Sequence, residues 1–106
     1  MECSQTNTPF KVAAFDSVCV TQVSAGYEHS LFLSDDGQVF ASGSNMDLQL
    51  GIGDGGFEKT QTPVVVSGLE SERVVQVDSS FSSACITDKG ELYMWGRGVQ
   101  GDTPFP

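Results

Sequence analysis

Hydrophobic and polar residues alternate within residues 20–43, and this stretch organises the chain. Leu31 and Leu33 are two residues apart, which is the spacing of side chains on one face of a half-buried strand. Asp35-Asp36-Gly37 separates two apolar runs, and Asp-Gly favours a hairpin because glycine accepts a positive φ where the chain reverses. The pattern predicts a strand over residues 18–25, followed by a hairpin of strands 30–34 and 38–42.

The same pattern returns in residues 74–96. Gln22-Val23 matches Gln76-Val77 at an offset of 54, whereas Gly37 matches Gly90 at an offset of 53, so one residue is missing from the turn between the first two strands of the second copy. Such self-similarity is the signature of a repeat architecture. It divides the chain into a flexible N-terminus (1–7), a first unit (8–61), a second unit (62–102) and the start of a third (103–106).

Each unit is predicted to begin with a strand that follows Thr-Pro, at residues 10–15 and again at 64–66. Residues 18–25 lack strict alternation and are nearly apolar until Thr21, so we expect an inner strand that is buried on both faces. The second unit repeats this strand at 74–77 and the hairpin at 84–87 and 92–95. Four short strands in a repeat of about 50 residues favour an all-β fold of propeller-like blades, each with four antiparallel strands.

Two blades are too few to close a ring, because a blade buries both faces against its neighbours. We therefore expect apolar faces and unpaired strand edges at both ends of the pair. Three arrangements would cover them, namely further blades of a longer protein, several copies of this chain, or another chain.

Residues 43–61 have no clear period and are rich in glycine, which predicts a long irregular loop held in place by Leu48, Leu50 and Ile52. Loops of this length in compact domains are often functional. We expect the contact surface of the protein to be the rim that bears this loop, mainly residues 45–61 together with Glu28.

Composition removes several classes of function. The net charge of −9 argues against sequence-independent binding of nucleic acid or an anionic membrane, and leaves a basic protein as a partner. No apolar run approaches the roughly 18–20 residues of a membrane span, and the first residues lack the features of a secretory signal. With three cysteines and no Cys/His cluster, we expect no metal site, buried reduced thiols at Cys19 and Cys85, and an intracellular location, cytoplasmic or nuclear.

Candidate catalytic residues have simpler structural interpretations. His29 is the only histidine and could act as a base, but its place in the repeat favours packing or hydrogen bonding between blades. Asp35-Asp36 lies in a hairpin turn, where aspartate is favoured by local hydrogen bonds. Residues 51–56 superficially suggest a phosphate loop, but the Lys-Ser/Thr pair and the following helix are missing. The sequence predicts no enzyme and no cofactor.

The motifs in combination resemble a repeat of the regulator of chromosome condensation family. The residues that fill its pattern are Val23, Gly26, His29-Ser30-Leu31, Gly37, Gly43-Ser44-Asn45, Gln49-Leu50-Gly51 and Gly53. Trp95-Gly96 fills the aromatic-glycine position in the second unit, where the first has Ser42-Gly43. The second unit lacks the histidine and the full Gln-Leu-Gly-x-Gly segment, so it is a divergent copy. The resemblance implies blades of a roughly seven-bladed propeller.

The resemblance also implies function. Many such proteins are binding or scaffold modules, and the founding members are guanine nucleotide exchange factors for the small nuclear transport GTPase, Ran. We therefore expect a protein-interaction module, with a part of an exchange factor as the alternative and a self-assembling structural subunit as the second alternative. The candidate binding residues are Glu28, His29, Asn45, Asp47, Gln49 and Asp54.

Overall fold

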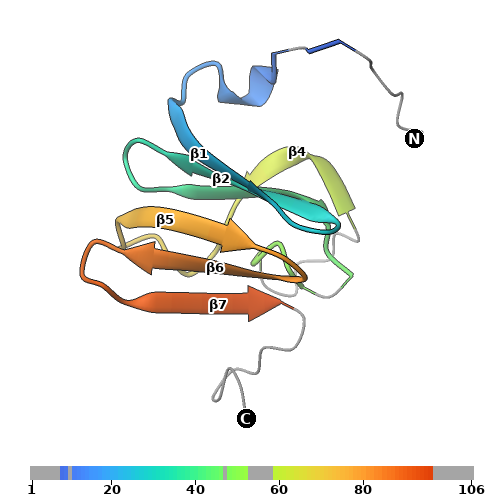
Figure 1. The fold of residues 1–106 in the computed structure, drawn as a ribbon. Helices are drawn as coiled ribbons and strands as arrows, with labels where there is room; N and C mark the ends of the chain where they lie inside the picture. The colour runs from blue at the N-terminus through green and yellow to red at the C-terminus, as the bar shows by residue number, and fades with distance from the viewer. Residues whose placement is uncertain (1–7, 10, 47, 53–58, 97–106) are drawn as a thin grey trace.

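A computed structural model describes residues 8–9, 11–46, 48–52 and 59–96, and two antiparallel sheets stack on each other in it (Figure 1). The first sheet has the order β1-β2-β3-β4, from strands Val20–Ala25, His29–Ser34, Val39–Ser44 and Lys59–Val65. The second has the order β5-β6-β7, from strands Val74–Ser79, Ser82–Thr87 and Leu92–Gly96. The predicted all-β class with antiparallel strands is confirmed. No helix among these residues is long and apolar enough to cross a bilayer.

The strand predicted over residues 10–15 is wrong. Ala13–Phe15 forms a single turn of 3-10 helix, η1, in which the amide of Phe15 donates to the carbonyl of Val12 at 3.2 Å. The turn places the ring of Phe15 against Phe32 and Phe40 of the first sheet, with centroid separations of 5.1 and 5.3 Å. The 3-10 turn, and not an extended strand, is therefore the conformation in which the Phe15 ring packs on the first sheet.

A strand forms where residues 64–66 were predicted, but it is Lys59–Val65, so it begins within the predicted loop 43–61 and before Thr62-Pro63. It also belongs to the sheet of the first unit. It is β4, which pairs with β3 through Phe40↔Val65 and Ala41↔Val64. The strand is at the edge of its sheet, where proline is tolerated because no ladder hydrogen bond is required of it. The hydrogen-bonded sheet thus runs from residue 20 to residue 65 and is offset from the repeat seen in the sequence.

Strand registers repeat between the two sheets. β1 pairs with β2 through Gln22↔Leu33, and β5 pairs with β6 through Gln76↔Ile86, each after a register shift one pair earlier. At the other end of the strands, Ala25 pairs with Ser30 and Ser79 pairs with Ser83. The second turn is one residue shorter, which confirms the deletion deduced from the sequence.

Burial of β1 on both faces was a wrong expectation. β1 is an edge strand of its sheet, and the second sheet covers only one of its faces. Gln22 and Ser24 point toward β5 and contact it, whereas Val23 is 62% exposed on the opposite face. The apolar run of β1 therefore includes an exposed residue, Val23, on the outer face, and its missing alternation does not reflect burial on both faces.

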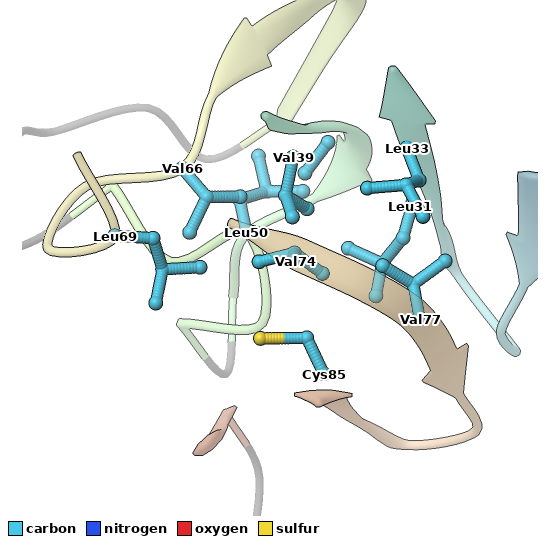
Figure 2. Packing of buried hydrophobic residues seen from close by; sticks show 10 residues of the cluster. Leu31, Leu33, Val39, Leu50, Val66, Leu69, Val74, Val77 and Cys85 are labelled. Atoms are coloured by element: carbon cyan, nitrogen blue, oxygen red, sulfur yellow. The ribbon is translucent and has the colours of Figure 1, made fainter. Parts of the chain in front are cut away.

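The core lies between the two sheets (Figure 2). Leu31 and Leu33 of β2 and Val39 of β3 face Val74 and Val77 of β5, and the loop after β3 adds Leu50. Each such side chain contributes about 1.5–3 kcal/mol when fully buried. Of the three predicted loop anchors, Leu50 is buried and Ile52 packs against the core, but Leu48 is exposed.

The two cysteines that the structure describes differ. Cys85 is buried in the core as predicted, whereas Cys19 is exposed, so its predicted burial is wrong. Cys19 precedes β1 by one residue and lies outside the packed strands. Burial, with a smaller effect of the Glu72 carboxylate, raises the pKa of the Cys85 thiol to about 11. Cys85 is therefore a packing residue and a poor nucleophile at neutral pH.

Candidate interaction rim

The β1–β2 turn, the β5–β6 turn and the loop after β3 meet at one end of the stacked sheets, which we call the turn rim (Tyr27, Glu28, Met46, Leu48 and Phe81). The amide of Tyr27 donates to the carbonyl of Ser80 at 3.0 Å, which joins the two turns. The amide of Ser44 donates to the carbonyl of Glu28 at 2.8 Å, which joins the first turn to the start of the loop. Backbone hydrogen bonds thus hold segments from both sheets together at this end.

Two stacked aromatic rings are exposed on the turn rim. Tyr27 and Phe81 lie with ring centroids 4.1 Å apart and an interplanar angle of 17°, yet they are 72% and 48% exposed. They occupy equivalent positions of the repeat, 54 residues apart. Met46 and Leu48 are also exposed. A group of exposed apolar side chains is typical of a surface that binds another protein.

Beneath the rim, a chain of buried hydrogen bonds crosses between the sheets. His29 of β2 is 2.9 Å from the Ser83 hydroxyl of β6 through its Nε2. The Ser83 hydroxyl donates to the carbonyl of Gln49 at 2.7 Å, and Trp95 Nε1 donates to the same carbonyl at 3.0 Å. Because the single hydroxyl proton of Ser83 is used at Gln49, the Ser83 oxygen accepts and His29 Nε2 carries the ring proton.

The environment of His29 favours the neutral ring. Its Nδ1 is buried and has no hydrogen-bond partner among the described residues. Burial lowers the pKa of His29, because protonation would place a charge and a second N–H where nothing accepts them. A ring that is buried and already engaged through Nε2 is a packing and hydrogen-bonding residue between the sheets, and this geometry supports the structural interpretation of His29.

Local hydrogen bonds shape the loop over this network. Asn45 accepts the amide of Leu50 on its side-chain oxygen at 3.1 Å and the amide of Leu48 on its backbone carbonyl at 3.1 Å. Glycine is required at Gly51, whose φ is +70°, because a Cβ there would lie 2.6 Å from Trp95 Nε1. Gln49 and Gly51 of this loop therefore pack closely against the second sheet.

The structure separates the predicted site residues into three groups. His29, Asn45 and Gln49 are buried close together beneath the turn rim, and Glu28 is exposed on it. Asp47 and Asp54 lie outside the described residues, as do the other residues of 53–58 in the predicted contact loop. No group of three or more His, Cys, Asp or Glu among the described residues is arranged to hold a metal ion.

Reasoning from the sequence missed Ser83 and the aromatic stack, and it identified Trp95 only as the aromatic residue of the repeat motif. The match of Tyr27 with Phe81 was available in the repeat alignment, since two aromatic residues occupy one position. Ser83 carried no comparable signal. Its role depends on the stacking of the second sheet against the first, which brings together residues 54 positions apart.

Comparison with known proteins places these observations in a family. Two sequence profiles of the Regulator of chromosome condensation (RCC1) repeat match residues 20–47 and 36–85. The chain is 36% identical over 90 residues to "RCC1 domain-containing protein RUG3, mitochondrial" of Arabidopsis thaliana, which covers 84% of this chain and 20% of that protein. It is 35% identical over 100 residues to the "X-linked retinitis pigmentosa GTPase regulator" of Canis lupus familiaris, covering 92% of this chain and 10% of that one.

Solved structures share the fold of this chain. The crystal structure of human WBSCR16 superposes with a TM-score of 0.70 at 32% identity, over 81% of this chain and 23% of that one. Prp20p of Saccharomyces cerevisiae, described with its binding to Gsp1p and histones, superposes with a TM-score of 0.63 at 24% identity, over 80% of this chain and 21% of that one. The chain spans about a fifth or less of the curated relatives named here.

Proposed function

The chain belongs to the regulator of chromosome condensation (RCC1) repeat family, and from this premise we propose that it is a non-catalytic module that binds a protein partner through the turn rim. The repeat family and the fold support an interaction module of the propeller type. The partner surface is the finer part of the proposal. It includes Glu28 and the loop that contains Asp47 and Asp54.

The observation that carries this proposal is the exposed stack of Tyr27 on Phe81. Exposed apolar patches mark sites of protein interaction, and tyrosine is enriched among the residues that dominate binding at the centres of interfaces. The amide of Tyr27 donates to the carbonyl of Ser80, and His29 and Ser83 are hydrogen-bonded to each other, so the turns that carry the rings are joined across the two sheets. A preordered surface loses less conformational entropy when it binds.

Purified binding partners provide the test. The yeast relative is described as binding Gsp1p and histones, and the net charge of −9 favours a basic protein. Titration by calorimetry should give binding of a Ran-type GTPase or of histones to the chain. The double variant Tyr27→Ser/Phe81→Ser should bind at least about thirtyfold more weakly, since even one hot-spot aromatic contributes about 2 kcal/mol or more.

A matched control is Lys89→Ser, because Lys89 is exposed in the β6–β7 turn at the opposite end of the sheets. This variant should bind as the unchanged chain does. Equal affinities of the aromatic variant and the unchanged chain would remove the rim proposal. Asp47→Ala and deletion of residues 54–58 test the loop in the same titration, and both are expected to weaken binding.

The alternative is a part of a guanine nucleotide exchange factor. The binding of Gsp1p by Prp20p and the description of another relative as a GTPase regulator favour it over other activities. A nucleotide-release assay on a Ran-type GTPase separates the two. Release accelerated by the chain supports exchange activity, whereas binding without acceleration supports a scaffold.

For the cell, we propose an intracellular location in the cytoplasm or the nucleus. One relative is named as mitochondrial, so the mitochondrion is the competing compartment. Fractionation of cells with an antibody against the untagged protein discriminates among the three.

A further inference from the structure

We propose that the two outer sheet faces of the chain bind each other between copies, so that chains associate head to tail. This proposal concerns surfaces other than the turn rim and does not depend on the function proposed above. In the first sheet, face A is the face that packs on the second sheet. In the second sheet, face A is the face made of the residues at the equivalent positions of the repeat. Face B is the opposite face of each sheet.

The contact within the chain joins face A of the first sheet to face B of the second. Face A of the first sheet presents Gln22, Ser24, Leu31, Leu33, Val39 and Ala41. Face B of the second presents Val74, Val77, Ser83, Cys85, Tyr93 and Trp95. This buried contact is the template for the proposal.

Apolar residues recur on the two faces that lie outside this contact. Face A of the second sheet carries Gln76, Ile86 and Leu92 in one row across the strands, and Asp78, Ala84 and Met94 in the next. Val39 is 2% exposed, whereas Leu92, its repeat-equivalent, is 61% exposed. A hollow of about 170 Å³ on this face is lined in part by Gln76, Ile86 and Leu92, and gives a partner side chain room to insert.

Face B of the first sheet shows the complementary pattern. Val77 is 7% exposed in the contact within the chain, whereas Val23 at the equivalent position is 62% exposed. Phe15 packs on Phe32 and Phe40 of this face, and its sequence equivalent Leu69 belongs to the core between the sheets. Face B of the first sheet is thus apolar at the positions that match Val77 and Leu69 of the contact within the chain.

A glutamine sets the register of the contact. The Gln22 side chain donates from Nε2 to the carbonyl of Val75 at 3.1 Å and accepts the amide of Val77 on Oε1 at 3.3 Å. Its repeat-equivalent Gln76 lies exposed on face A of the second sheet. In a second copy, the groups that correspond to those two are the carbonyl of Thr21 and the amide of Val23. Gln76 would therefore fix one register between copies.

A second copy of this chain is the occupant to which these observations lead, because each copy carries one face of each kind. The contact is heterologous, so the face used by one copy differs from the face used by the next. Such a contact extends the stack in one direction and does not produce a two-fold dimer. The mass in solution should therefore increase with concentration.

Light scattering on the whole chain, its Leu92→Asp variant and its Val23→Asp variant tests this. The unchanged chain should gain mass with concentration, and each variant alone should stay monomeric because one of its two faces carries a charge. An equimolar mixture of the two variants should form a one-to-one heterodimer, since each contributes an intact face of the other kind. Gln76→Ala should weaken association about tenfold through the loss of two neutral hydrogen bonds.

Leu48→Asp is the matched control, because Leu48 is an equally exposed apolar residue that lies on neither face. It should associate as the unchanged chain does, and circular dichroism should show the same β signal for all variants. A chain that is monomeric at about 1 mM, a mixture that stays monomeric, or single variants that still self-associate would overturn the proposal. The Tyr27→Ser/Phe81→Ser variant should assemble normally, so failure of the rim proposal is distinguishable from failure of this one.

Discussion

Substitution of Ser83 by alanine tests the hydrogen-bonded layer between the sheets. Ser83 is 1% exposed, and its hydroxyl oxygen lies 2.9 Å from His29 Nε2 and 2.7 Å from the Gln49 carbonyl oxygen. Without it, Gln49 still accepts from Trp95 Nε1, but His29 keeps an N–H that nothing accepts. The other neutral tautomer gives no relief, because Nδ1 has no partner among the described residues.

The magnitude follows from that single orphaned donor. A buried donor left unsatisfied costs about 1–3 kcal/mol, so the free energy of unfolding should fall by about 2 kcal/mol. For a domain of this size each kcal/mol shifts Tm by about 4–8 °C. Urea unfolding followed by the fluorescence of Trp95, the single tryptophan, measures the change at the interface itself.

A double-mutant cycle with His29→Leu identifies the cause. Leucine removes the donor but leaves the Ser83 hydroxyl bonded to Gln49, so the double variant should lose about 1–2 kcal/mol less than the sum of the single variants. Ser82→Ala, at the half-buried neighbour, serves as the control and should lie within about 0.5 kcal/mol of the unchanged chain. A Ser83→Ala variant as stable as the unchanged chain, or strict additivity, would refute the assignment of this layer.

Three further outcomes are expected. Burial lowers the pKa of His29, so the unfolded chain takes up a proton at this residue before the folded chain does as the pH falls. The free energy of unfolding, measured from roughly pH 7.5 to 5, should therefore be constant above the ordinary histidine pKa of about 6.5 and should decline below it. His29→Gln should remove that decline. Gly43→Ala should lower the free energy of unfolding more than Gly68→Ala does, as urea titrations can measure. Both glycines have a positive φ, which alone costs a residue with a side chain about 1–3 kcal/mol. Of the two, only Gly43 would place the new Cβ against backbone, 2.5 Å from the Glu28 carbonyl oxygen. Iodoacetamide at around pH 8 should label Cys19 and spare Cys85 in the folded chain, as peptide mass mapping can show; labelling of both at equal rates would contradict the burial of Cys85.

Local chemistry made much of the fold predictable. The sequence locates two hairpin turns, at Asp35-Asp36-Gly37 and Asp88-Lys89-Gly90. Each turn contains a position with positive φ, and glycine takes that conformation at no steric cost. Spacing by two in Leu31 and Leu33 gives the buried face of β2. The offset between Gln22 and Gln76 gives the repeat. Each of these signals acts over a few residues or compares the chain with itself, so none depends on which strands pair in the folded protein.

The errors share one physical origin. Phe15 leaves the extended conformation in a turn whose ring packs on Phe32 and Phe40, and that partner surface exists only after β2 and β3 pair. The strand that contains Pro63 joins the preceding sheet because the edge of β3 is available to it. Long-range pairing decided both outcomes, and propensity over a short window carries no information about it.

The candidate site divides in the same way. The sequence by itself determined the repeat, the all-β class and the residues His29, Asn45 and Gln49 as one motif, since these depend on residue type and spacing. Only the tertiary structure decided that their side chains are buried and that Ser83 completes the layer, because the sheets must stack before residues 54 positions apart can share a hydrogen bond. Stacking likewise decided that Tyr27 and Phe81 meet in solvent, since they lie in turns of different sheets and only the packing of those sheets brings the two turns together.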